Sequence, residues 1–281
     1  MTPMSSQVQK ERAAQFRQLH HEAPLLVLPN VWDAAGAWII EQAGFHAVAT
    51  TSSGVATALG YHDGQQISRD LLIATLAHIT RVVTCPVTAD IEAGYGNSIA
   101  EILQTVKAVI ATGVVGINIE DSLIGQEKAL ADLPYQVELI KALRELATSL
   151  DIPFVINARV DVFLRGIGQP ESRFEDAVQR ANAYLQAGAD CAYPIGMLDG
   201  TTIANLVKAI DGPINILGGP SALTLSELKQ LGVARVSLAG GLMRSVLGHI
   251  RTIAHELLEH GTYTSMSTEA LSNAEFRSLF S

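Results

Sequence analysis

The feature that most limits the fold of this sequence is a repeated turn, in which a helix ends at glycine and a short apolar run follows. Clear copies lie around Gly44, Gly113, Gly188 and Gly232. Glycine directly after a helix tolerates the left-handed backbone that ends it, so each copy predicts a helix followed by a strand. With the other short apolar runs, these turns predict eight strands. They cover residues 25–29, 46–51, 86–90, 115–120, 153–159, 190–194, 213–217 and 235–239.

Amphipathic helices are predicted between these strands. In residues 98–112, apolar residues recur at three- and four-residue steps, and Ser98 with Glu101 is typical of a helix start. The strands begin about 30 residues apart on average, which is the length of one strand and helix unit. Eight such units predict an α/β fold, a closed (β/α)8 barrel. An open doubly wound sheet is the alternative, but no GxGxxG motif follows the first strand.

Two segments lie outside the eight units. A helix is predicted at residues 6–20, before the first strand, and residues 268–280 carry helical signals near the C-terminus. We therefore expect one barrel domain over residues 1–261, including the N-terminal helix, and a helical tail over residues 262–281. The tail could dock on a neighbouring subunit.

Composition narrows the possible partners. Hydrophobic residues make up 48% and charged residues 17% of the chain, which is typical of a folded protein. The net charge of -9, the scattered basic residues and the 5% of aromatic residues argue against nucleic acid. No apolar run approaches the roughly 20 residues that span a bilayer, and no signal-peptide core is present, so we expect a cytoplasmic protein. Cys85 and Cys191 fit neither a disulfide framework nor a zinc motif and are predicted to be buried.

Conspicuous polar residues lie where the predicted strands end. Asn30 follows the first strand, the run TTSSG at residues 50–54 follows the second, and Asn215 lies in the seventh. The third, fourth and fifth strands end in TADIEAGYG, NIEDS and NARVD. Because barrel enzymes place their chemistry at the C-terminal ends of the strands, these residues predict one site on one rim.

Acidic residues at this rim predict a metal site. An extended backbone would place Asp90 and Glu92 on the same side, and Glu120 ends the neighbouring strand. Three carboxylates so close repel one another unless a cation lies between them, and an all-oxygen set suits Mg2+ or Mn2+ rather than zinc. The alternative is that these carboxylates cap helices and balance Arg159.

Arg159 predicts an anionic substrate, because a guanidinium group on a barrel rim matches a carboxylate or a phosphate. The alternative is a structural arginine paired with Asp161 or Glu120. Glycine-rich runs at residues 217–221 and 238–243 follow the seventh and eighth strands, a frequent phosphate-binding position in barrels. A substrate that carries a phosphate group is therefore a further alternative.

In this order, the segments resemble the isocitrate lyase and phosphoenolpyruvate mutase superfamily. The resemblance rests on LPNVWDA, TTSSGVATALGYHDG, ADIEAGYG, NIEDS, NARVD and GVARVSLAGG. It implies a (β/α)8 barrel whose eighth helix is often exchanged between subunits, and a homodimer or homotetramer. It also implies bound Mg2+.

The resemblance further implies roles for individual residues. The metal carboxylates are Asp63, Asp90, Glu92 and Glu120, although the family usually has aspartate at position 92. Substrate contacts are implied for Ser52, Ser53, Gly54, Arg159 and Asn215. We also expect contacts from Asp90 and from Gly94 and Tyr95, which lie in a glycine-rich loop with one aromatic residue. Asp63, Glu120 and Arg159 are the predicted catalytic residues.

Departures from the family pattern affect the expected reaction. Isocitrate and methylisocitrate lyases carry a loop after the fourth strand whose cysteine acts as the acid, whereas residues 122–132 here contain neither Cys nor His. The mutases carry Lys and Asn in this loop, and only Lys128 could take such a place. A glutamate of the lyases after the sixth strand is replaced by the region of Ile195 and Gly196. Their Asn-x-Thr run after the seventh strand is replaced by LGGPS.

We therefore expect a Mg2+-dependent lyase or hydrolase that cleaves a C–C bond of a small 2-oxo or 2-hydroxy acid, such as oxaloacetate, through a pyruvate-type enolate. Without the acid cysteine, the enolate would take its proton from water or from another group. One alternative is C–P bond chemistry on phosphonopyruvate. A second is a protein that binds a 2-oxo acid without turning it over.

Overall fold

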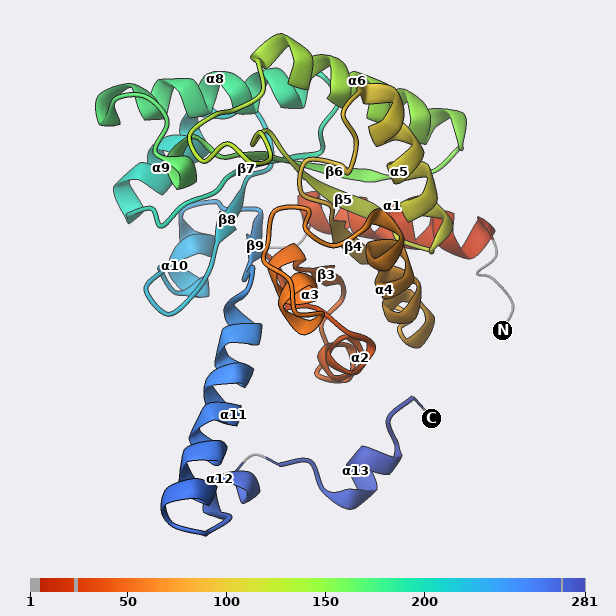
Figure 1. Cartoon of the computed structure of the whole chain (residues 1–281). Coiled ribbons are helices and arrows are strands. Elements are labelled where there is room, and N and C mark those ends of the chain that lie inside the picture. The colour runs from red at the N-terminus through yellow and green to blue at the C-terminus, as the bar shows by residue number, and fades with distance from the viewer. Residues whose placement is uncertain (1–5, 23–24, 269, 281) are drawn as a thin grey trace.

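Eight strand positions form a closed ring in the computed structural model, which describes residues 6–22, 25–268 and 270–280 (Figure 1). The first predicted strand is divided into β1 (Leu26–Leu28) and β2 (Asn30–Val31). The others are β3 (Val48–Thr50), β4 (Val87–Asp90), β5 (Gly116–Glu120), β6 (Val155–Val160), β7 (Cys191–Pro194), β8 (Asn215–Leu217) and β9 (Arg235–Ser237).

Parallel pairing between neighbours closes this ring. One sheet has the order β2-β3-β4-β5-β6-β7 and the other the order β1-β9-β8. A parallel bridge between Ala192 and Ile214 joins β7 to β8. Pro29 separates β1 from β2, and because proline has no N–H to donate, the ladder is interrupted there. The predicted (β/α)8 barrel is confirmed.

Helices cover the outside of the ring, and buried leucine, isoleucine and valine side chains fill the space between the two layers. Ser98 accepts a hydrogen bond from the Glu101 N–H, so the helix predicted at residues 98–112 is confirmed. The covering helices are α2 (Ala34–Gln42), α3 (Ser52–Ala58), α4 (Arg69–Val82), α5 (Ile99–Ala111), α6 (Leu133–Ser149), α7 (Val162–Arg165), α8 (Arg173–Gln186), α9 (Gly200–Ala209) and α10 (Leu225–Gln230), with a 3-10 turn at Pro170–Ser172.

The predicted N-terminal helix is confirmed as α1 (Ser6–Glu22), which lies against the barrel (Figure 1). Its Phe16 packs in a second apolar cluster with Val155 and other residues from the starts of the strands. A buried carboxylate ties the helix down, because Asp190 pairs with Arg17 at 2.9 Å and also with Arg144 of α6. Helix α1 therefore covers the end of the barrel opposite the predicted site.

The C-terminal helix α11 (Gly241–Glu259) extends away from the barrel (Figure 1). Met243 is its one buried side chain. The tail holds two short helices, α12 (Thr264–Ser267) and α13 (Asn273–Arg277), rather than one continuous stretch over 268–280, and residue 269 lies outside the described residues. The Phe280 ring lies 6.4 Å from the Trp38 ring on α2. A domain boundary after residue 261 remains a prediction.

The expectation that both cysteines are buried is half correct. Cys191 is buried, whereas Cys85 is only half-buried. Cys85 lies at a surface corner where Glu41 accepts hydrogen bonds from the N–H groups of Thr84 and Cys85. Among the helices of the described residues, none is both long and apolar enough to cross a membrane.

Candidate active site at the C-terminal rim

Asp90 joins three neighbouring strands at the rim. Its Oδ1 accepts a hydrogen bond from Asn118 Nδ2 at 3.0 Å, and its Oδ2 accepts one from the Ser52 N–H at 3.1 Å. Its own N–H donates to Thr50 Oγ1 at 2.9 Å. The carboxylate is therefore fixed at the end of β4, between the ends of β3 and β5.

Glu92 reaches the site by a different backbone path from the one expected. Strand β4 ends at Asp90, and Glu92 has a left-handed φ of 52°, so the expectation of an extended backbone through Glu92 is wrong. Its Oε2 accepts hydrogen bonds from the N–H groups of Gly64 and Gln65, both at 2.8 Å. Its Oε1 accepts a hydrogen bond from the Tyr95 hydroxyl at 3.1 Å. Glu92 thus connects two rim loops.

Three of these carboxylates lie near one another without a basic partner. Burial, then the charges of Asp90 and Asp63, raises the pKa of Glu92 to about 7. Burial and the charge of Asp90 also raise the pKa of Asp63, although a hydrogen bond from Ser52 opposes the rise. Among the described residues, Asp63, Asp90 and Glu92 form no ion pair. This part of the rim therefore carries negative charge that no protein cation balances by contact.

Arg159 lies on the opposite side and has carboxylate partners. Its Nη1 is 2.7 Å from Glu120 Oε2, across the β5 and β6 pairing. Its Nε and Nη2 donate to the two oxygens of Asp161 at 2.6 and 2.8 Å. Burial opposes the charge of Arg159, but Glu120 and Asp161 raise the pKa of the guanidinium above its usual value. The structural pairing that the sequence left open is therefore present.

The partners of Arg159 are themselves held by other residues. Asp161 Oδ2 accepts a hydrogen bond from Ser122 Oγ at 2.5 Å, and the Asp161 N–H donates to Asp121 Oδ1 at 2.9 Å. Burial raises the pKa of Glu120, and contact with Arg159 opposes that rise. Sequence reasoning named Asp161 only as a structural partner and did not consider Ser122. Their positions in NIEDS and NARVD, at the ends of adjacent strands, were the available signal.

The serine-rich run begins α3 beside Asp90. Thr51 Oγ1 lies 3.0 Å from Ser53 Oγ, and Ser52 donates its N–H to Asp90. A Cβ at Gly54 would lie 2.6 Å from Thr51 Cγ2, so only glycine fits there. Asn215, in contrast, is fully buried inside the barrel, where its Nδ2 donates to Ser237 Oγ at 3.0 Å. Asn215 therefore does not lie at the rim, where the sequence predicts its contact with the substrate.

Two adjoining cavities open around these groups. The smaller one, of about 370 Å³, is called the mouth cavity here; Asp63, Glu92, Glu120, Arg159 and Arg165 line it, together with part of the loop after β5. The larger one, of about 890 Å³, is called the side cavity and shares Glu120 with the first.

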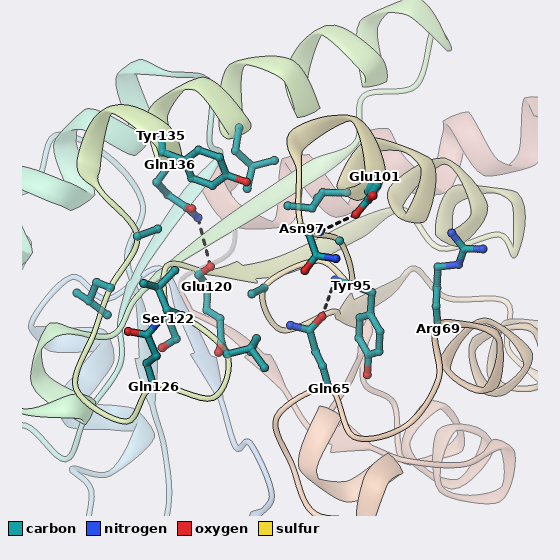
Figure 2. A pocket seen from close by; sticks show the side chains of 18 of the residues that line it. Gln65, Arg69, Tyr95, Asn97, Glu101, Glu120, Ser122, Gln126, Tyr135 and Gln136 are labelled. Atoms are coloured by element: carbon teal, nitrogen blue, oxygen red, sulfur yellow. Dashed lines mark hydrogen bonds between the residues drawn. The ribbon is translucent and has the colours of Figure 1, made fainter.

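The side cavity has a mixed wall. Figure 2 shows Tyr135 and Gln136 of α6 on one side and Tyr95 with Gln65 on the other. Between these polar groups the wall is apolar, formed by Ile67, Ile102, Leu123, Leu130 and Leu139. The side cavity could therefore accept an uncharged or apolar part of a ligand whose charged end lies in the mouth cavity.

The carboxylates fit a hydrated divalent cation better than a closed metal cage. Across residues 6–22, 25–268 and 270–280, no three His, Cys, Asp or Glu side chains are grouped so that they could hold one metal ion. Mg2+, however, usually keeps several of its waters and uses few direct protein ligands. The unbalanced charge of Asp63, Asp90 and Glu92 is suited to such an ion.

Comparison with known proteins agrees with this architecture. The family model for phosphoenolpyruvate phosphomutase matches residues 16–258. The chain belongs to this family, within the isocitrate lyase and phosphoenolpyruvate mutase superfamily. The resemblance seen in the sequence is therefore confirmed.

Individual members of the superfamily show how far the similarity reaches. An uncharacterized protein of Mycobacterium tuberculosis is 37% identical over 223 residues, which are 79% of this chain and 80% of that protein. The 2-methylisocitrate lyase of Aeropyrum pernix is 27% identical over 94% of this chain and 85% of its own length. The crystal structure of a candidate lyase/mutase from Burkholderia cenocepacia matches with a TM-score of 0.89 at 34% identity, over 96% of each chain. Lyases and mutases therefore both occur among the superfamily relatives of this enzyme.

Proposed function

We propose that this superfamily member is a Mg2+-dependent lyase or hydrolase that breaks a C–C bond of a small 2-oxo or 2-hydroxy acid. The observation that carries the proposal is the mouth cavity, where Asp63 and Glu92 lie without a basic partner opposite the guanidinium of Arg159. Negative charge on one wall suits a divalent cation, and the guanidinium groups of Arg159 and Arg165 on the other offer donors to an acid, although both also contact Glu120 and Asp161.

The residues of the chain have distinct tasks in this reaction. Asp63, Asp90, Glu92 and Glu120 would hold Mg2+ directly or through water, and the bound ion would supply electrostatic stabilisation for an enolate. Ser52, Ser53 and Gly54 bind the substrate carboxylate, with Asp90 fixing the position of Ser52. Arg159 orients the anion, and Asp161 keeps its guanidinium in place.

In a 2-oxo acid such as oxaloacetate, the bond between C3 and its carboxylate breaks and CO2 leaves, and the electron pair that stays on C3, next to the keto group, forms the pyruvate-type enolate. The loop at residues 122–132 carries no Cys or His, so water supplies the proton that completes the product. Tyr95, whose hydroxyl donates to Glu92 Oε1, and Gly94 contact the substrate from the side of Glu92 in this proposal. The side cavity leaves room for a substituent on the acid.

The first test is an activity screen. Purified protein is incubated with oxaloacetate and with 2-oxo and 2-hydroxy acids that carry alkyl substituents, with Mg2+ or with EDTA, and pyruvate and free phosphate are measured. We expect pyruvate release that EDTA abolishes and added Mg2+ or Mn2+ restores. Turnover that ignores EDTA would reject the metal mechanism.

Two other outcomes of the screen separate the alternatives. Release of phosphate or phosphonate from phosphonopyruvate would indicate C–P chemistry. If calorimetry shows tight binding of a 2-oxo acid and mass spectrometry detects no product, the result would indicate a binding protein. A cytoplasmic location and the absence of nucleic acid and membrane partners remain part of the proposal.

Helix α11 has exposed apolar side chains that suggest how the chain forms oligomers. Apolar side chains of this helix remain exposed in the single chain, among them Val246, Leu247 and Ile250. Burying such a face against a second chain would stabilise it. We therefore propose a homodimer or homotetramer in which α11 packs on a neighbouring subunit.

A substitution on α11 tests this assembly. Ile250→Glu is expected to convert the oligomer into a species of about half its mass or less, because a buried glutamate would lack a partner. The mass is measured by size-exclusion chromatography with light scattering. Leu225→Glu on α10, also an exposed apolar residue, is the control and should leave the mass unchanged. An unchanged mass in Ile250→Glu would exclude this face from the interface.

A further inference from the structure

The interior of this barrel is unusually polar. The centre of a (β/α)8 barrel is normally filled by branched apolar side chains. Here the strands enclose a cavity of about 30 Å³, called the inner cavity, below the rim. The buried polar side chains along its wall are those of Asn30, Thr50, Thr88, Asn118, Tyr193, Arg235 and Ser237.

Arg235 is the most unusual of these residues, because it is 2% exposed and forms no ion pair among the described residues. Its two hydrogen bonds go to neutral partners, from Nε to Ser237 Oγ and between Nη1 and His20 Nε2, both at 3.4 Å. Burial and the charge of Arg235 lower the pKa of His20 to about 3, so this imidazole is neutral. The guanidinium also lies 6.0 Å from the centre of the Phe16 ring.

A buried arginine without a carboxylate is costly, because its charge has lost water and has gained no counterion. Asp90 also lines the inner cavity and attracts Arg235 electrostatically. However, both oxygens of Asp90 already accept hydrogen bonds, from Asn118 and from the Ser52 N–H. Arg159 lines the cavity as well, but its guanidinium is shared between Glu120 and Asp161.

Two hydroxyl groups at the inner cavity are left without hydrogen-bond partners. Among the described residues, Thr88 and Tyr193 each have a buried hydroxyl without a partner, and a hydroxyl can both donate and accept. The acceptor Asn30 Oδ1 already receives the N–H groups of residues 238 and 239.

Two buried acceptors also lack partners, but they lie elsewhere. They are the Oδ1 atoms of Asn157 and Asn215, and neither residue lines the inner cavity. A water molecule could bond to both hydroxyl groups, but it would leave the buried charge of Arg235 without a counterion. The uncompensated charge of Arg235 therefore favours an anion over water.

We propose that the inner cavity binds a small inorganic anion of about the size of chloride, held by the Arg235 guanidinium and the hydroxyl groups of Thr88 and Tyr193. A cavity of about 30 Å³ accepts one such ion but not the carbon skeleton of a carboxylic acid. The anion would lie beside Arg235 in the barrel interior, although Arg159 lines both this cavity and the mouth cavity. It supplies the counterion that the protein does not provide for Arg235.

Chloride exchange at constant ionic strength tests the site. Full-length protein is dialysed into sodium gluconate, whose anion is too large for the cavity, and chloride then replaces gluconate stepwise while the thermal midpoint is recorded. We expect the midpoint to rise and saturate, because a ligand that binds only the folded state stabilises it. Crystals soaked in bromide should show an anomalous peak beside Arg235.

Conservative variants assign the effect to this cavity. Thr88→Val and Tyr193→Phe each remove one donor with little change in volume, and each should weaken the apparent chloride affinity about tenfold. Tyr184→Phe is the control, because this buried hydroxyl donates to Asp121 outside the inner cavity, and it should leave the chloride dependence unchanged. A midpoint that ignores the exchange of gluconate for chloride, or a cavity that holds only water in bromide-soaked crystals, would overturn the proposal.

Discussion

Replacing Arg159 with lysine is expected to lower kcat/KM by about 100-fold, mainly through a higher KM, while the fold and metal binding are retained. The guanidinium offers a fork of donors, of which two bind Asp161 and one reaches Glu120. Lysine keeps the positive charge but presents a single ammonium group. It could balance one carboxylate, but it could not also orient a substrate anion.

Steady-state kinetics with the acid identified by the activity screen measures this effect, and far-UV circular dichroism checks the fold. Arg173→Lys is the matched control, because Arg173 donates to the backbone oxygen of Ile167 and lines neither the mouth cavity nor the side cavity. Both variants should unfold at temperatures within a few degrees of the wild type. If Arg159→Lys kept the wild-type KM and kcat, the arginine would serve only to balance Glu120 and Asp161.

The rim position of Arg159 follows from the sequence, whereas its ion-pair partners do not. Strand ends can be read from apolar runs and glycine turns, so Asp90, Glu120 and Arg159 were placed correctly at one rim. The partner of Arg159 could not be chosen, because it depends on Ser122 and Asp121, which hold Asp161 from the adjacent strand. Such contacts follow from how side chains pack between strands that are distant in sequence.

Backbone irregularities explain the other differences. The left-handed conformation at Glu92 occurs at a residue type that does not favour it, so no local pattern announced it. Pro29 ends the apolar run of residues 25–29, and a second short strand, β2, follows it at Asn30–Val31. Asn215 pairs in register with Arg235 at the start of β9, and that register places it inside the barrel rather than at the rim. The pairing register between two strands depends on how all strands close into the ring, so it cannot be predicted from the sequence of one strand.

Removing the carboxylate of Asp190 is expected to cause a large loss of stability although this residue lies outside the active site. Its side chain is 2% exposed, pairs with Arg17 of α1 and Arg144 of α6, and accepts the Ile156 N–H at 2.8 Å. Asp190→Ala would leave a buried N–H and a half-buried guanidinium without their partner. The expected cost is about 3 kcal/mol, because removing one member of a buried ion pair leaves the other uncompensated.

Thermal and urea unfolding of Asp190→Ala measure this loss of free energy. In the thermal experiment it corresponds to an unfolding midpoint that is lower by roughly 6 to 12 °C. Asp151→Asn is the matched control, because Asp151 also pairs with α1, through Lys10, but its side chain is 88% exposed, and asparagine tolerates the left-handed backbone at this position. A solvent-exposed pair contributes little, so this control should lose less than about 0.5 kcal/mol. Equal losses in the two variants would mean that the apolar contacts of Phe16, and not the buried ion pair, hold α1 against the end of the barrel.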